Sequence, residues 1–194
     1  MYRRTRKKPL QKPSEKIRLE KTGEELAEKY RLHRWDYIIA GDGSGTSWDN
    51  PVGFGSILYC RNNGVRRRFF GGFSNGTSNV AEMMAVILPL LYIESNANFK
   101  HEIPNVYVIS DSLYVVNTGN GEYALKTNRA LWETVNHLRT RLNLNFVYER
   151  RMLLPANVFG DQIGNTIRMD FQQFTHQLDT LYFANPNDKN KDSK

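Results

Sequence analysis

Short apolar segments bounded by turn residues divide the first part of the chain into three predicted strands. The segments 35–40, 53–59 and 66–73 carry apolar and aromatic residues, and clusters of Asp, Asn, Pro and Gly separate them. This spacing predicts three antiparallel strands in succession. Two later apolar runs, 106–110 and 145–148, predict further buried strands.

Helices are predicted between and after these strands. A nearly continuous apolar run follows Asn79, which is typical of a helix packed into a core, and Pro89 should kink this helix or end it early. A short helix is expected at 112–116 and an amphipathic helix at 127–142. Strands first and alternation later predict an α/β fold. We expect a five-stranded mixed sheet flanked by helices, with three antiparallel strands before the alternating part.

The two ends of the chain differ in composition from its middle. Residues 1–34 form a basic extension rich in Lys and Arg, in which capping-box spacing at Thr22 and Glu25 predicts a short helix. This extension could contact phosphates or could simply keep the protein in solution. We expect one folded domain over 35–183 and a disordered polar tail over 184–194.

Net charge and cysteine content narrow the class of protein. The formal net charge of +7 favours a polyanionic partner, usually nucleic acid, although a protein can be basic without one. Cys60 is the single cysteine, so no internal disulfide forms, which fits a reducing compartment. The longest apolar stretch, 83–93, is too short to span a bilayer, and the basic start lacks a secretory apolar region. We expect an intracellular, cytoplasmic protein without membrane contact, with the nucleus or a virus as open alternatives.

Four acidic residues stand at the ends of predicted elements. Asp42 and Asp111 each end a strand, Glu82 lies in the first turn of a helix, and Asp161 lies on or just before a last helix. In open α/β sheets, ligands bind at the carboxyl ends of the strands. Carboxylates gathered there repel each other unless cations neutralise them, and oxygen donors suit Mg²⁺ or Mn²⁺. Two such ions could support an in-line phosphoryl displacement.

Each of these acidic residues also has a simpler local explanation. Asp42 lies in an Asp-Gly-Ser-Gly sequence that favours a turn, and Glu82 has capping-box spacing to a helix start three residues earlier. Asp111 could belong to a helix N-cap, and Asp161 could be a solvated surface residue. The local rules alone leave both interpretations open.

Four sequence blocks in this order and spacing resemble the ribonuclease HI family. They are Asp42–Gly45 followed by Gly53–Leu58, then Thr77–Ala85, Val108–Val115 and Asn157–Asp161. Leu131 and Trp132 also fall where the family often has Leu-Trp in a core helix. The similarity spans about Tyr37 to Met169 and implies a ribonuclease H-like fold.

The resemblance also implies a function and a set of site residues. Family members cut the RNA strand of RNA–DNA hybrids as two-metal-ion endonucleases. The implied catalytic ligands of two Mg²⁺ ions, for which Mn²⁺ could substitute, are Asp42, Glu82, Asp111 and Asp161. The implied substrate contacts are Ser44, Thr77 and Asn79. One departure is that 150–160 contains no His, which many members carry in the loop before the last Asp.

Two other functions stay open at this point. One is a nuclease of the same fold that acts on DNA or on branched nucleic acid. The other is a non-catalytic nucleic-acid-binding subunit of a larger assembly. The presence of all four carboxylates favours catalysis, because buried acids without a use cost stability.

Overall fold

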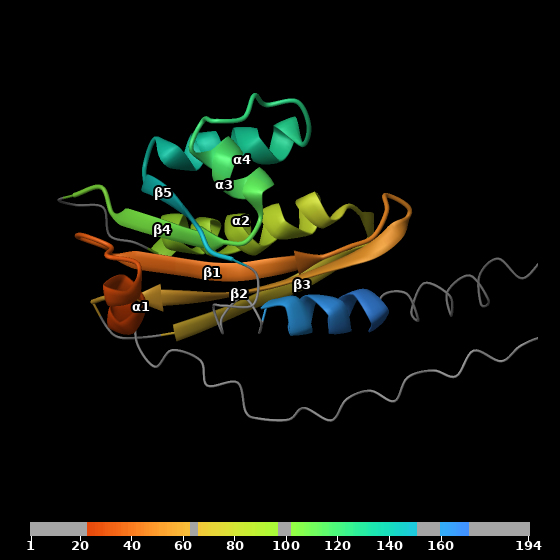
Figure 1. Ribbon diagram of the computed structural model, residues 1–194, viewed down its shortest axis with the longest axis horizontal. Helices are drawn as coiled ribbons and strands as arrows, with labels where there is room; N and C mark the ends of the chain where they lie inside the picture. The colour runs from red at the N-terminus through yellow and green to blue at the C-terminus, as the bar shows by residue number, and fades with distance from the viewer. Residues whose placement is uncertain (1–22, 63–65, 97–101, 151–159, 171–194) are drawn as a thin grey trace, which may run out of the picture.

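The computed structural model of the protein describes residues 23–62, 66–96, 102–150 and 160–170. They form one mixed sheet with helices on both faces (Figure 1). The strands are β1 (Tyr37–Ser44), β2 (Asn50–Cys60), β3 (Arg66–Gly76), β4 (Asn105–Ser110) and β5 (Asn143–Tyr148). The helices are α1 (Gly23–Lys29), α2 (Ser78–Asn96), α3 (Leu113–Gly119) and α4 (Arg129–Arg139). Residues 160–170 are also helical.

The strand order across the sheet is β3-β2-β1-β4-β5. β2 runs antiparallel to both β1 and β3, whereas β4 runs parallel to both β1 and β5. Three strands joined in sequence therefore fill one side of the sheet, and strands reached through helices fill the other. This arrangement confirms the predicted α/β fold with a five-stranded mixed sheet.

The helices divide between the two faces of the sheet. Figure 1 shows α2, α3 and α4 on one face, and α1 and the helical segment 160–170 on the other. Side chains alternate accordingly along β2: Leu58 joins the cluster beneath α2 and α4, while Ile57 and Tyr59 join the cluster with α1. β2 is thus buried on both sides, which explains why it carries few polar residues.

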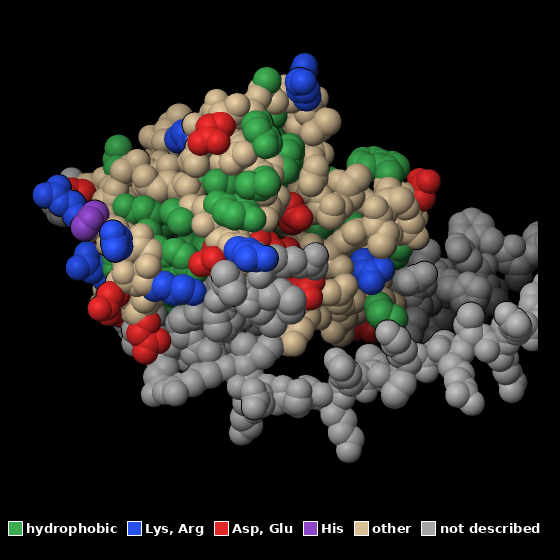
Figure 2. Space-filling view, in the orientation of Figure 1, with side chains coloured by type: hydrophobic (Ala, Val, Ile, Leu, Met, Phe, Trp, Pro, Cys, Tyr) green, Lys and Arg blue, Asp and Glu red, His purple; other side chains and the backbone are tan. Residues whose placement is uncertain are grey.

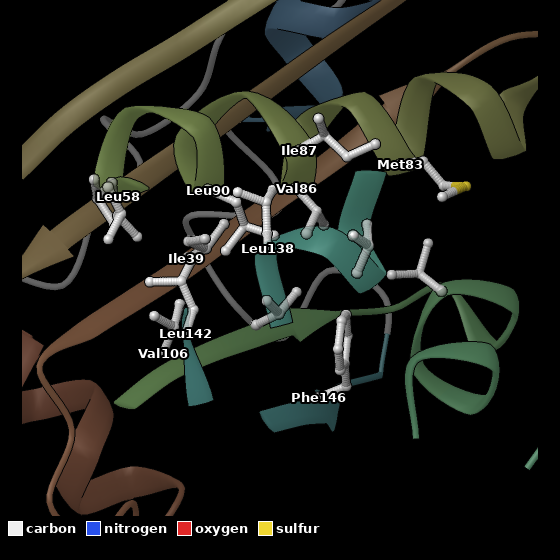
Figure 3. Packing of buried hydrophobic residues seen from close by; sticks show 14 of the residues in the cluster. Ile39, Leu58, Met83, Val86, Ile87, Leu90, Val106, Leu138, Leu142 and Phe146 are labelled. Carbon is white, nitrogen blue, oxygen red and sulfur yellow. The ribbon is translucent and has the colours of Figure 1, made fainter. Parts of the chain in front are cut away.

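The main core lies between the sheet and helices α2 and α4. Ile39, Leu58, Leu90, Val106 and Leu138 are each at most 1% exposed. Figure 3 shows these side chains meeting between α2, α4 and the strands. Burying an apolar side chain of this size contributes about 1.5–3 kcal/mol, so this cluster fixes how the helices sit on the sheet.

Helix α1 packs on the opposite face. Leu26 is fully buried there, in one cluster with Trp35, Ile38 and Tyr59. The described end of the N-terminal extension is therefore packed against the domain. Residues 1–22 and 171–194 lie outside the described residues, so the predicted domain boundaries stay predictions.

The structure corrects several expected element bounds. β1 was expected to end near Ala40, but it continues to Ser44, so Asp42 pairs with Gly55 inside the ladder. Pro89 does not end α2, which continues to Asn96. Leu90 and Ile93, beyond the proline, are almost fully buried, and their burial offsets the roughly 3 kcal/mol that an interior proline costs. α3 is longer than expected and α4 is shorter.

None of the helices in the described ranges is both long enough and apolar enough to cross a membrane.

Candidate active site

Two acidic residues lie where β1 and β4 reach the same edge of the sheet. These strands are parallel neighbours, and their last registered pair is Ala40 with Ile109. Asp42 and Asp111 follow two residues later along each chain. Because the carboxyl ends of adjacent parallel strands open onto one crevice, the sheet topology places these two acidic residues at the same point.

Helix α2 brings Glu82 to this edge by packing very closely on β1. The contact point is Gly43, where an added Cβ would lie 2.2 Å from the backbone nitrogen of Glu82 and 2.4 Å from the carbonyl carbon of Ala81. No side chain fits in that space. Glycine at position 43 therefore allows the first turns of α2 to rest directly on the strand that carries Asp42.

The helical segment 160–170 brings in the fourth acidic residue by a second close contact. A Cβ added at Gly160 would lie 2.5 Å from the carbonyl oxygen of Gly55 and 2.7 Å from the backbone nitrogen of Asp42. The helix backbone thus lies against the backbones of β1 and β2. Asp161 is the next residue, which places it beside Asp42.

These elements enclose a polar pocket of about 460 Å³. Its lining consists of acidic, glycine, serine and asparagine residues: Asp42, Gly43, Ser44, Gly45, Ser78, Glu82, Asp111, Asp161 and Asn165. Figure 2 shows acidic side chains grouped near the middle of the visible face, with Lys and Arg side chains on both sides of them. The four predicted acidic residues therefore line one pocket.

The other carboxylates in this pocket disfavour the ionisation of Asp42. Burial, together with repulsion from Asp111 and, to a smaller extent, from Asp161 and Glu82, raises the pKa of Asp42 from 3.8 to about 7. The backbone N–H of Gly43 donates to Asp42 Oδ1 at 2.8 Å and opposes part of this rise in pKa. Asp42 is only 7% exposed, so water screens the repulsion poorly. A cation in the pocket would relieve it.

Comparison with known proteins adds to this geometry. No protein-family model matches the chain. A curated ribonuclease H from Pseudomonas fluorescens is 30% identical over 96 residues, which make up 50% of this chain and 57% of that protein. The chain therefore matches little more than half the length of this relative.

Solved structures match a larger share of the fold. The N-terminal RNase H domain of Rv2228c from Mycobacterium tuberculosis superimposes with a TM-score of 0.61 at 20% identity, over 72% of this chain and 97% of that one. LC11-RNase H1 in complex with an RNA/DNA hybrid gives a TM-score of 0.58 at 23% identity, over 69% and 97%. RNase H1 from Halobacterium salinarum gives 0.55 at 18% identity, over 69% and 98%.

The chain has the ribonuclease H-like fold. The resemblance of the sequence blocks to ribonuclease HI correctly predicted this fold.

Hydrogen bonds at the starts of α2 and α3 remove two of the simpler explanations for the acidic residues. Thr77, rather than Asn79, stands at the start of α2, because its hydroxyl accepts the backbone N–H of Val80 at 3.3 Å. Glu82 lies beyond the capping position of that helix. At α3 the N-cap is Ser112, whose side chain accepts from Val115. Asp111 is therefore not needed for capping.

The oxygen donors of this pocket suit a hard divalent cation, and none of the described residues that line it is a His or Cys. Among the described residues, however, no three His, Cys, Asp or Glu side chains are arranged to hold one ion. The carboxylates share a pocket without converging on a point. The chemistry of the donors fits a metal site. The carboxylate side chains would have to rotate to close around one ion.

Only one of the three predicted substrate contacts lines the pocket. Ser44 lines the pocket, whereas Thr77 and Asn79 do not, and Ser78 between them does. Sequence reasoning missed Asn165, although its spacing of four residues from Asp161 puts both on one helical face. The segment without His, 151–159, lies outside the described residues.

Proposed function

We propose that this protein is an endonuclease that hydrolyses the RNA strand of RNA–DNA hybrids with the help of two divalent metal ions. The observation that carries the proposal is the pocket at the carboxyl ends of β1 and β4, where four carboxylates gather on a ribonuclease H-like fold. A relative named ribonuclease H and a structural neighbour solved with an RNA/DNA hybrid support this choice of substrate.

The four carboxylates would hold the metal ions. Asp42, Glu82, Asp111 and Asp161 offer only oxygen donors, which suit Mg²⁺, with Mn²⁺ as a substitute. When bound, such ions activate a water molecule and stabilise the leaving oxygen of a phosphodiester. Rotation about the side-chain torsions would bring the acidic groups onto shared ions, since all four already face one pocket.

Other parts of the chain would bind and orient the substrate. The net charge of +7 attracts a polyanion and speeds its encounter with the protein. Ser44 in the pocket wall would contact the substrate, while Thr77 and Asn79 at the start of α2 would contact backbone phosphate and sugar. An Asn side chain can both donate to and accept from the 2′-hydroxyl that distinguishes RNA from DNA.

A cleavage assay tests the proposal. The full chain, supplied with Mg²⁺, should nick end-labelled RNA in an RNA–DNA hybrid, and a chelator should stop the reaction. Asp111→Asn should abolish cleavage without lowering the urea concentration at which the protein unfolds, since it removes a charge that repels Asp42. Glu133→Gln, an exposed acid on α4, is the matched control and should cleave like the parent protein.

The choice of substrates separates the alternatives. Duplex DNA and branched DNA are offered in parallel with the hybrid. Cleavage of DNA with the hybrid left intact would replace the proposal by a DNA-directed nuclease of the same fold. Binding of nucleic acid without cleavage under any metal condition would favour a non-catalytic role. Cleavage by Asp111→Asn at the parent rate would contradict the assigned site.

A further inference from the structure

Asn165 links two walls of the acidic pocket. Its Nδ2 donates to Asp161 Oδ1 at 3.0 Å, and its Oδ1 accepts from the hydroxyl of Ser44 at 2.6 Å. Asp161 and Asn165 belong to the helical segment 160–170, whereas Ser44 is the last residue of β1. All three side chains line the pocket. One amide therefore connects an acidic group of the site to a predicted substrate contact.

The direction of both hydrogen bonds follows from the chemistry of the three groups. The carboxyl oxygen Oδ1 of Asp161 accepts the hydrogen bond, so the nitrogen of the Asn165 amide faces Asp161. The amide oxygen then faces Ser44, whose hydroxyl has one proton and donates it to this oxygen. The remaining lone pairs of Ser44 Oγ are left to accept a hydrogen bond from an incoming group.

We propose that Asn165 is a positioning residue for this site. It holds the Asp161 carboxylate in the orientation needed for cation binding, and it sets Ser44 as a hydrogen-bond acceptor toward a hydroxyl of the substrate. This inference rests on the proposed function. Residues that hydrogen-bond a metal ligand from behind orient it, and their loss typically lowers metal affinity or activity by about 10- to 100-fold.

A purely structural role is the competing explanation. Asp161 and Asn165 are four residues apart on one helix, and such pairs stabilise helices slightly. The bond to Ser44 also ties this helix to β1. Asn165→Leu separates the two roles, because leucine resembles asparagine in branching, favours helix more strongly and makes neither hydrogen bond. A structural role predicts a change in unfolding, whereas a positioning role predicts a change in metal binding.

The test measures metal binding directly as well as catalysis. Mn²⁺ is titrated into the full chain and free Mn²⁺ is followed by electron paramagnetic resonance. Asn165→Leu should bind Mn²⁺ about 10- to 100-fold more weakly and need correspondingly more Mg²⁺ for half-maximal cleavage of a hybrid. Its urea midpoint should stay near that of the parent. Gln162→Leu, at an exposed position in the same helical segment, is the matched control. It should leave the Mn²⁺ affinity, the Mg²⁺ requirement and the urea midpoint unchanged.

Ser44→Ala provides the second variant, because it removes the other end of the hydrogen-bonded chain without changing a residue of the helix. It should raise KM for the hybrid and weaken Mn²⁺ binding roughly two- to tenfold, the range expected for one hydrogen bond. The effects of Ser44→Ala and Asn165→Leu on Mn²⁺ affinity should not add in the double variant, since both break one chain.

The outcomes separate this inference from the proposed function. A parent protein that neither binds Mn²⁺ nor cleaves hybrid would remove the proposed function itself. A parent protein that does both, with Asn165→Leu behaving identically, would overturn only the role of Asn165. If Asn165→Leu does not fold, unchanged Mn²⁺ affinity in Ser44→Ala overturns the inference instead.

Discussion

Replacing Asp42 with asparagine should stabilise the metal-free protein while abolishing its proposed activity. The carboxyl of Asp42 is buried among three other acidic groups, and its pKa is raised from 3.8 to about 7. Ionising it in the folded protein therefore costs free energy that the unfolded chain does not pay. An amide has no charge to ionise, and its oxygen can still accept the N–H of Gly43.

The raised pKa also fixes the direction of the pH dependence. Below about pH 4 the Asp42 carboxyl is protonated in both the folded and the unfolded chain, so it does not change the free energy of unfolding. Between about pH 4 and pH 7 the unfolded chain loses this proton while the folded protein keeps it, so the free energy of unfolding falls as pH rises. Above about pH 7 the penalty is complete and constant.

The difference between 3.8 and about 7 corresponds to roughly 4 kcal/mol, at about 1.36 kcal/mol per pH unit. The new amide N–H₂ group needs hydrogen bonds in a partly enclosed pocket, which offsets about 1 kcal/mol. We therefore expect Asp42→Asn to be about 3 kcal/mol more stable near pH 8. With a urea dependence of about 2 kcal/mol per molar, the unfolding midpoint should rise by roughly 1.5 M.

Urea unfolding of the parent protein and Asp42→Asn, in chelator and across about pH 4 to 8, measures this directly. The difference in urea midpoint between the parent protein and Asp42→Asn should grow with pH. Mg²⁺ should reduce this difference, because it stabilises the parent protein more than the variant. Glu133→Gln, an exposed acid on α4, should follow the parent curve. A variant no more stable than the parent at about pH 8, or a gap independent of pH, would refute the reasoning.

Further predictions concern metal affinity, helix docking and the core. Because the metal-binding form of Asp42 is ionised, the Mg²⁺ concentration for half-maximal cleavage should rise as pH falls below about 7, as measured by Mg²⁺ titrations at several pH values. Gly160→Ala should lower cleavage by about 100-fold, since its Cβ would displace the helix that carries Asp161, while Gln162→Ala should have little effect on the rate. Tyr114→Phe should cost about 1–3 kcal/mol in urea unfolding, because Trp132 Nε1 donates to this hydroxyl at 3.0 Å and would lose its acceptor. Leu138→Ala, at a site 1% exposed, should cost about 2–5 kcal/mol by the same measurement.

The sequence by itself determined the order of the elements and identified four candidate acidic residues along them. Alternating and continuous apolar runs report which faces of an element are buried, and this is a local property that each segment carries. The three-strand start, the later alternation and the position of Asp111 directly after a strand followed from it, whereas β1 continues past Asp42. The resemblance of the four sequence blocks then implied that Asp42, Glu82, Asp111 and Asp161 share one site, which their separation along the chain does not show.

Only the tertiary structure decided how these elements meet. Gly43 and Gly160 each allow a helix to lie on β1 at backbone distance, and the space around a glycine depends on elements remote in the chain. Pro89 stays inside α2 because long-range packing outweighs the local penalty. The bond between Asn165 and Ser44 could not be predicted, because it joins residues 121 positions apart. Periodicity reports burial, whereas contact between distant side chains exists only once the chain has folded.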